Sequence, residues 1–360
     1  MNTYNILPLE LPSVSGPVLS IVLHDKRIIA GYSSEERKSL RIWNPEGGLC
    51  VKTINGWQGT SQCIALAVHE NYIFSSYNDL TGPIQLNHSK TGDKLDCFKI
   101  YDSFAIEFGS DTGLAKTFVM SLAVNSDYVA AASWSGGVKV YKWSGEGSKW
   151  SGEGKDKIPC LTEPEKELCP DVGNAGKPVT LGFSTNLLFR AFKDTIKCLN
   201  TEANFEFNDW GPKFDGQITD MATSWSYVAV VHNKVRFVKH KKAGETGTVE
   251  VFDPETGKLE FKIQMEEGDT FNCCAIEYDT LAVAGSSNKV RIIDLEKGSS
   301  TYGKIMQELH VPDNDVIKDI DLSYEMVVCG GKSGKIYMYA RKEKGSCIKG
   351  YEQANPQLKF

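Results

Sequence analysis

The residue types that most often carry out chemistry do not occur here at the spacings that known sites require. The six histidines are scattered along the chain, at His24, His69, His88, His232, His240 and His310. No H-E-x-x-H or H-x-H motif is present, and none of the ten cysteines forms a C-x-x-C pair, so we expect no metal site. A Walker-type lysine loop and a G-x-S-x-G motif are also absent. We therefore expect no catalytic residue, no cofactor and no small-molecule substrate.

One cluster of charge is stronger than any other in the chain. Residues 233–247 read NKVRFVKHKKAGETG, in which Glu245 is the only acid. The cations are Lys234, Arg236, Lys239, His240, Lys241 and Lys242. Charge runs usually lie on a solvated face, so one interpretation is an exposed β-ribbon. The alternative is a basic finger that grips the phosphates of RNA or an acidic protein.

The elements that must position these residues repeat along the chain. Residues 40–54 read LRIWNPEGGLCVKTI, and residues 249–263 read VEVFDPETGKLEFKI, with a proline, a glutamate and a glycine at the same offsets. A looser copy occupies residues 84–100. Alternating apolar residues place one face of a strand in a core, and Asn, Asp, Pro and Gly supply the turn. Each copy therefore predicts a β-hairpin.

A second pattern precedes the hairpins: an alternating strand, a tight polar turn, and a run of small and β-branched residues. It occurs seven times, starting at Ser20, Ala65, Ser121, Leu181, Asp220, Cys274 and Asp319. Joined to a hairpin, it gives four short strands per repeat at about the period of propeller blades. Such units bury both faces only when they pack radially around an axis. The sequence therefore predicts an all-β fold, a seven-bladed β-propeller of four-stranded antiparallel blades.

We expect residues 1–360 to form a single propeller domain. The predicted blades span roughly residues 17–61, 62–115, 116–177, 178–214, 215–268, 269–312 and 313–360. Two segments are candidates for the strand that closes the ring, one within residues 1–16, from Tyr4 to Leu9, and one at residues 346–351. Either would hide a strand edge that otherwise invites aggregation.

The third strands of the predicted blades include LRIWN, VKVYKW, TIKCLN, VRIIDL and IYMYA. Over nearly the whole chain, this pattern resembles the WD-repeat (WD40-like) β-propeller family. Trp43-Asn44 stands where that family has Trp-Asp, and Ile293-Asp294 keeps the acid, whereas the Gly-His dipeptide of the family is missing. The resemblance implies a rigid, non-catalytic scaffold for protein interactions, as a subunit of a larger protein or ribonucleoprotein assembly.

The predicted connections between blades at residues 54–62, 101–118 and 207–217 are long and aromatic. In the WD-repeat family such connections share a face with the loop between the second and third strands, which here is the basic finger. Rigid aromatic rings beside cations are typical of interaction hot spots. The predicted partner-binding residues are Trp57, Phe104, Phe108, Trp210, Phe214, Arg236, Lys239, Lys241, Lys242 and Trp150. The alternative is that the rings fold back as plugs between blades.

Trp150 belongs to residues 143–177, which interrupt the turn between the last two strands of the third blade. This segment begins with the internal repeat WSGEGSKWSGEG and continues into EPEKELC at residues 163–169. Its composition favours a flexible loop. The other interpretation is that Trp143 and Trp150, with a short helix at EPEKELC, dock a partner.

Composition and charge narrow the function classes further. The formal net charge of −6 argues against binding of nucleic acid or anionic membrane by the whole molecule, but leaves room for a local basic patch. The N-terminus lacks a signal-peptide pattern, and no apolar run is longer than Cys63–Val68, so we expect no membrane insertion. Cysteines within strand-like runs favour a reduced compartment, which is the cytoplasm or, alternatively, the nucleus.

Two other functions stay open at this point. The first is a propeller that contacts RNA through a basic hairpin at residues 234–242. The second is an enzyme whose His, Asp or Arg side chains from several blades meet in the central channel. Paired acids such as Asp319 and Asp321 are interpreted as ordinary strand residues.

Overall fold

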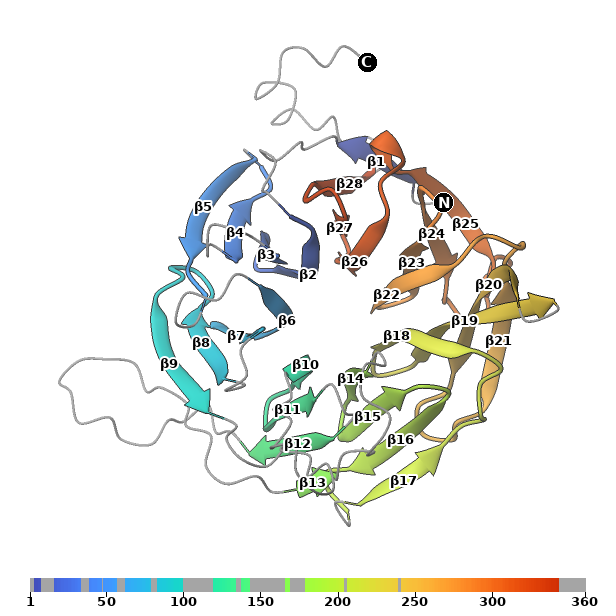
Figure 1. The fold of residues 1–360 in the computed structure, drawn as a ribbon, viewed down its shortest axis with the longest axis horizontal. Helices are drawn as coiled ribbons and strands as arrows, with labels where there is room; N and C mark the ends of the chain where they lie inside the picture. The colour runs from blue at the N-terminus through green and yellow to red at the C-terminus, as the bar shows by residue number, and fades with distance from the viewer. Residues whose placement is uncertain are drawn as a thin grey trace.

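Seven β-sheets surround a central axis in the computed structural model of the chain (Figure 1). The structure describes residues 3–7, 16–33, 39–46, 48–56, 62–78, 83–99, 119–133, 137–142, 166–168, 179–203, 206–238 and 241–342. Within these ranges, the one helical element is the 3₁₀ turn η2 (Pro312–Asn314), which is far too short to cross a membrane. Each sheet contains four strands, which confirms the predicted all-β propeller of seven blades.

The strands of the first four blades follow one another in chain order from the axis outward. Blade one contains β2 (Val18–His24), β3 (Arg27–Tyr32), β4 (Leu40–Asn44) and β5 (Leu49–Ile54). Blade two contains β6 (Cys63–His69), β7 (Tyr72–Tyr77), β8 (Pro83–His88) and β9 (Lys94–Lys99). Blade three contains β10 (Val119–Val124), β11 (Tyr128–Ser133), β12 (Val138–Lys142) and β13 (Lys166–Leu168). Blade four contains β14 (Val179–Ser184), β15 (Leu187–Phe192), β16 (Thr195–Asn200) and β17 (Phe207–Trp210).

The last three blades include the longest strands and the one blade that is built from both ends of the sequence. Blade five contains β18 (Gln217–Thr223), β19 (Val228–Val238), β20 (Lys241–Phe252) and β21 (Leu259–Gln264). Blade six contains β22 (Phe271–Glu277), β23 (Thr280–Gly285), β24 (Lys289–Asp294) and β25 (Ile305–His310). Blade seven contains β26 (Ile317–Leu322), β27 (Met326–Gly331), β28 (Ile336–Lys342) and β1 (Thr3–Leu7).

Apolar side chains fill the seams between neighbouring blades. The second strands are deeply buried; β11 and β23, for example, are buried at every position after the first. Their small alanine, valine and glycine side chains let neighbouring sheets approach each other near the axis. A hydrophobic cluster occupies each of the seven seams. The core is therefore a ring of interblade clusters rather than one central cluster.

The ring closes through the N-terminal strand. β1 pairs antiparallel with β28, with Thr3 opposite Lys342 and Leu7 opposite Met338. The first of the two predicted closures is thus confirmed, and it makes β1 the outer strand of blade seven (Figure 1). Residues 346–351, the other candidate, lie outside the described residues.

Two local predictions are wrong. Within EPEKELC, Lys166–Leu168 forms strand β13, which pairs with the edge of β12, and not a helix. Within residues 207–217, Phe207–Trp210 forms the outer strand β17 and not a connecting loop, because it pairs with β16. In both cases the open edge of a three-stranded sheet decides the structure, and this overrides the local preference of the sequence.

Candidate functional site

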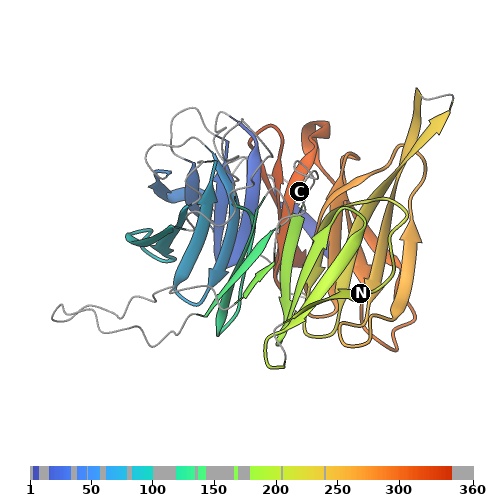
Figure 2. The same ribbon diagram turned by 60° about the horizontal axis from the view of Figure 1, so that its bottom comes forward.

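The basic cluster predicted from the sequence lies on an extension of blade five. β19 and β20 pair from Val228 opposite Phe252 to Val238 opposite Lys241. Their neighbours stop much earlier: β18 pairs with β19 only as far as Asn233, and β21 pairs with β20 only as far as Thr248. We call residues 234–247 the ribbon; within it, residues 234–238 and 241–247 form a two-stranded projection beyond the sheet (Figure 2). They prolong the second and third strands of the blade and do not form a separate hairpin.

Ion pairs to the two flanking interblade loops hold the base of the ribbon. Lys234 Nζ lies 2.5 Å from Asp215 on one side, and an Arg236 guanidinium nitrogen lies 2.8 Å from Glu267 on the other. All four side chains are about half exposed or more, so each pair contributes roughly 0–1 kcal/mol. The charge of Arg236, a predicted partner-binding residue, is thus already balanced within the chain.

Phe237 follows directly and is 66% exposed. A phenylalanine at this exposure contributes little to the hydrophobic core, because its ring stays largely in water. It lies opposite Lys242 in the ribbon, one position before Val238 pairs with Lys241. The backbones of Lys241 and Lys242 thus lie at the distal end of β20, while their side chains and Lys239 lie outside the described residues.

A buried polar network lies directly below the ribbon. His232 Nε2 lies 3.4 Å from Glu250 Oε1, and Lys262 Nζ lies 2.6 Å from the same oxygen. The hydrogen bond with His232 is the main reason that the pKa of Glu250 is lowered, and Lys262 lowers it further. The His232 ring packs edge-on against Phe214 at a centroid distance of 5.4 Å. This network fixes the strands from which the ribbon projects.

An open cleft of about 750 Å³ adjoins the base of the ribbon, between blades four and five. Its walls are the turn at Lys193 and Asp194, the loop Lys213–Gln217, and Asn233 with the ribbon residues Lys234 and Val235. Lys213 is paired with Asp194 at 3.1 Å, as Lys234 is with Asp215. Opposite charges alternate along the walls, so the cleft does not present a single-sign field that would concentrate an anion.

The central channel is lined by the inner strands of all seven blades and encloses about 420 Å³. Three aspartates on these strands accept backbone hydrogen bonds from the next blade. Asp319 Oδ2 accepts from Ile21 N at 2.7 Å, and Asp321 Oδ2 accepts from Leu23 N at 2.7 Å. These two bonds connect blade seven to blade one across the ring closure.

The third aspartate, Asp220, accepts from Cys274 N at 2.9 Å and connects blade five to blade six. Burial raises the pKa of Asp220 to about 6 and that of Asp321 to about 7. Burial also raises the pKa of Asp319 well above its usual range, with a further contribution from the charge of Asp220. Among the described residues, no group of His, Cys, Asp and Glu side chains converges so as to hold a metal ion.

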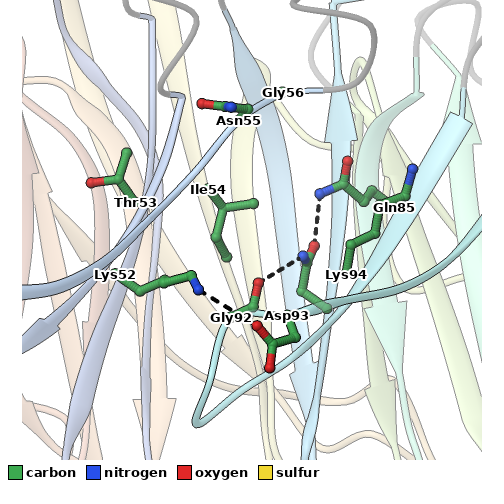
Figure 3. Close-up of a pocket in the computed structure, with 10 residues that line it drawn as sticks. Lys52, Thr53, Ile54, Asn55, Gly56, Gln85, Gly92, Asp93 and Lys94 are labelled. Atoms are coloured by element: carbon green, nitrogen blue, oxygen red, sulfur yellow. Dashed lines mark hydrogen bonds and ion pairs between the residues drawn. The ribbon is translucent and has the colours of Figure 1, made fainter.

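A second cleft, of about 510 Å³, opens between blades one and two. The buried amide of Gln85 donates to Asn87 Oδ1 at 2.8 Å, and the Asn87 amide donates to Gly92 O at 3.1 Å. Figure 3 shows Gln85, Gly92 and Lys52 in this cleft. Gly92 has a φ of +70°, and a Cβ there would lie 2.6 Å from Lys52 Cγ, so only glycine fits this turn. Lys52 Nζ lies 3.5 Å from Asp93 across the seam. The two amide hydrogen bonds lie within blade two, whereas the Lys52–Asp93 pair joins it to blade one.

Comparison with known proteins identifies the fold of this chain. No protein-family model matches the sequence, and no curated protein matches it. The structure of U3-55K matches over 94% of this chain and 98% of its own, with 13% identity and a TM-score of 0.66. The WD40 repeats of RRP9 match over 94% of this chain and 97% of theirs, with 13% identity and a TM-score of 0.66. The chain has the fold of WD40-repeat propellers.

The WD40 domain of Pan2 from Neurospora crassa gives the same result, over 92% of this chain and 90% of its own, with 14% identity and a TM-score of 0.61. At such identities the likeness is one of fold. The resemblance predicted from the third strands is therefore confirmed as a WD40 fold, reached with sequences that share few residues.

Within this WD40 fold, two of the predicted aromatic residues lie between blades four and five. The Trp210 ring is 4.8 Å from Phe189 and 5.6 Å from Phe252, and its Nε1 donates to Pro254 O at 3.2 Å. Phe214 is only 5% exposed. Both rings fill the seam, as in the alternative interpretation, and contact of either with a partner stays a prediction. Trp57, Phe104, Phe108 and Trp150 lie outside the described residues.

Sequence reasoning did not assign the interblade role of the channel aspartates. A signal was present, since Asp220 and Asp319 both begin a copy of the second repeat pattern. Ser121 begins another copy, and its Oγ accepts from Leu181 N of the next blade at 3.0 Å. In these three copies, the polar residue at the first position of the pattern accepts a hydrogen bond from the following blade.

Proposed function

We propose that this chain is a non-catalytic interaction scaffold, a subunit of a larger protein or ribonucleoprotein assembly, which docks a partner through its ribbon. The observation that carries the proposal is the projection of β19 and β20 beyond the strands that flank them. The exposed Phe237 ring and the ion pairs at the ribbon base contribute little to folding. A segment that is ordered, aromatic and basic, and that the core does not need, is well suited to binding.

The chemistry of the ribbon favours an acidic protein surface as its partner. Lys234 and Arg236 are balanced by Asp215 and Glu267. The further cations of the cluster are Lys239, Lys241 and Lys242, which the sequence places toward the tip. Cations at the end of a projection attract an acidic partner early in the encounter. Binding would then bury Phe237, which supplies the apolar contact.

RNA contact is the second candidate function, because the same tip combines cations with an exposed aromatic ring. Single-stranded nucleic acid binds to surfaces on which bases stack on aromatic side chains and phosphates contact lysine. Phe237 and the three lysines of the tip could serve in this way. The two candidates differ in how strongly binding depends on salt and on nuclease treatment.

The hydrogen bonding of the channel supports a scaffold over an enzyme. Asp220, Asp319 and Asp321 each accept a backbone hydrogen bond from a neighbouring blade, so these carboxylates are engaged in holding the ring. No cofactor is proposed. A location in the cytoplasm or the nucleus stays a prediction from the cysteine pattern.

The test is affinity capture of the tagged full-length chain at low salt, with and without nuclease, analysed by mass spectrometry. The variant carries Lys239→Glu, Lys241→Glu and Lys242→Glu together. A matched control carries Lys258→Glu, Lys304→Glu and Lys332→Glu, three exposed lysines that lie outside the ribbon. We expect a stable set of proteins that survives nuclease, is lost from the ribbon variant and is retained by the control.

The other outcomes decide against the proposal. A protein set that the ribbon variant retains would mean that the ribbon is not the docking element. A set that disappears on nuclease treatment as well as in the ribbon variant would move RNA contact to first place. In that case, affinity for labelled RNA should fall steeply with salt, and the slope should be smaller in the variant.

A further inference from the structure

The turns between the first and second strands carry an unexpected pattern around the ring. In each blade, we compare the four residues between two residues that face each other, one at the end of the first strand and one at the start of the second. In blade five, for example, these four residues lie between Thr223 and Val228. In blades one to four, the second of these four residues is polar: Asp25, Glu70, Ser126 and Thr185. In blades five, six and seven it is aromatic: Trp225, Tyr278 and Tyr324.

These three aromatic side chains are turned to solvent. Trp225 is 71% exposed, Tyr278 61% and Tyr324 58%. Their equivalent positions in three successive blades make them neighbours in the ring (Figure 1). Monomeric proteins rarely gather exposed aromatic rings in this way, whereas interaction sites are enriched in Trp and Tyr. We call these three residues, together with the acids Glu277, Asp279 and Glu325 of the same turns, the aromatic arc.

The arc lies at the mouth of the channel, on the face opposite the ribbon. Trp225 precedes β19, whereas the ribbon forms the far end of the same strand. Thr219 donates a hydrogen bond to Phe271 O, and Asn272 donates one to Ile317 O, so the beginnings of the inner strands of blades five, six and seven lie next to one another. These three strands therefore run in the same direction. All three turns therefore open on one face, close to the axis.

The backbone conformation of this turn position recurs around the ring. Tyr278 has a φ of +49°, and its equivalents Asp25, Glu70 and Thr185 have φ values of +47°, +50° and +48°. The left-handed conformation therefore belongs to the turn in blades with a polar residue as well as in blade six. What distinguishes the arc is the type and exposure of its side chains.

The charges of the arc have a single sign. Within the three turns, the charged residues are Glu277, Asp279 and Glu325, and none is basic. Lys297, on the next turn of blade six, is held by Glu260 at 3.1 Å. Carboxylates between aromatic rings make a surface to which a cation can bind by stacking on a ring and pairing with an acid.

From this geometry we propose that the aromatic arc docks a basic, arginine- or lysine-rich segment of a protein partner. The planar guanidinium of arginine stacks on Trp and Tyr faces and pairs with carboxylates, so it matches both components of the arc. The acids repel the phosphates of nucleic acid, which makes an RNA occupant the less favourable one. The inference goes beyond the ribbon, because it adds a second docking surface on the other face with the opposite charge preference.

The test measures binding of a fluorescent peptide of alternating arginine and glycine to the full-length chain at low salt. The aromatic variant carries Trp225→Ala, Tyr278→Asn and Tyr324→Ala, and the charge variant carries Glu277→Gln, Asp279→Asn and Glu325→Gln. The matched control changes the same turn position in other blades, with Glu70→Asn, Ser126→Ala and Thr185→Asn. Thermal unfolding establishes that each variant is folded, and because all of the changed positions are in turns we expect each to fold.

We expect the wild-type chain and the control to bind the peptide equally. Both arc variants should bind about tenfold more weakly or worse, because cation–π and ion-pair contacts are lost. Absence of binding to the wild-type chain, or equal binding by the aromatic variant, would overturn the proposal. So would stronger binding of labelled oligouridine than of the peptide at the arc.

One occupant needs a separate measurement, namely the basic ribbon of a second copy of this chain. Concentration-dependent association that both the arc variant and the ribbon variant abolish would assign the arc to self-association and overturn the proposal. The ribbon variant should otherwise bind the peptide like wild type. Failure of the ribbon in the capture experiment therefore leaves the result for the arc unaffected, and the two proposals can fail separately.

Discussion

At the scale of single residues, the channel aspartates illustrate how a buried acid can hold two distant segments together. Asp321 accepts from Leu23 N of blade one through one oxygen and from Leu322 N through the other, at 2.7 and 2.9 Å. These bonds favour the charged carboxylate, whereas burial favours the neutral acid. Burial dominates, with a contribution from the nearby charge of Glu277, and raises the pKa to about 7.

The first prediction from this balance concerns the pH dependence of stability. The folded-state pKa of Asp321 lies above its unfolded value, so its contribution to stability is complete at acid pH and is lost as pH rises through about 7. We expect wild-type stability to fall by roughly 1–3 kcal/mol from this residue between about pH 5 and pH 8. Urea unfolding across this range should show a shallower fall for Asp321→Asn. A residual slope is expected, because Asp220, Asp319 and Glu277 also have raised pKa values.

Asp209→Asn provides the control for this measurement. The side chain of Asp209 is 90% exposed and lies on the outer strand β17, so its replacement should leave the pH dependence as in wild type. Identical pH dependence in wild type and Asp321→Asn would show that the Asp321 carboxyl does not titrate in this range.

At the scale of elements, the ribbon differs from the other hairpins in the described part of the chain in its relation to the core. Val228 and Val231 at the start of β19 are fully buried, while Arg236 and Phe237 near its end are exposed. The same strand therefore begins as a core element and ends as a surface projection. The residues after Asn233 project beyond the flanking strands. Their contacts with the ring include the two ion pairs at the base and the backbone hydrogen bond from Gly268 N to Glu245 O.

The second prediction is that the ribbon can be removed without unfolding the propeller. A two-residue Asn-Gly turn replaces residues 234–246 and joins Asn233 to Gly247, which lie opposite each other. We expect the free energy of unfolding to fall by about 1–2 kcal/mol, because two exposed ion pairs and the backbone hydrogen bond from Gly268 N to Glu245 O are lost. Phe252→Ala, in the buried part of blade five, should by comparison cost about 3–5 kcal/mol. A loss of that size on removal of the ribbon would mean that it stabilises the ring.

Sequence alone predicted the elements that depend on local pattern and missed those that depend on distant partners. Alternation and turn residues were enough for the inner three strands of each blade. The segment of β13 was interpreted as a flexible loop or a short helix, and that of β17 as a loop. Both were missed because their strand structure comes from the free edges of β12 and β16. The bond between Asp321 and Leu23 spans most of the chain, so no local pattern could reveal it. The basic ribbon was found because its charge run is local.

At the scale of the whole molecule, the ring is closed at two radii by interactions between its first and last strands. Near the axis, Asp319 and Asp321 of blade seven accept from Ile21 and Leu23 of blade one. At the rim, β1 completes blade seven by pairing with β28. Each of the other blades takes its four strands from one continuous segment, so the seam between blades seven and one is the place where the ring can open.

The third prediction follows from this arrangement, and it concerns removal of residues 1–7. Loss of the β1 ladder should lower the free energy of unfolding by about 2–5 kcal/mol, at roughly 0.5–1.5 kcal/mol for each hydrogen bond. The exposed edge of β28 should also promote association, which sedimentation velocity would detect. Removal of residues 1 and 2 alone is the control and should change neither property.

Because opening at the rim loosens the inner contacts of the same seam, the amides of Ile21 and Leu23 should exchange hydrogen faster in the truncated chain. Unchanged exchange at these two amides, with a stable monomer, would mean that the channel aspartates hold the ring closed without help from the N-terminal strand.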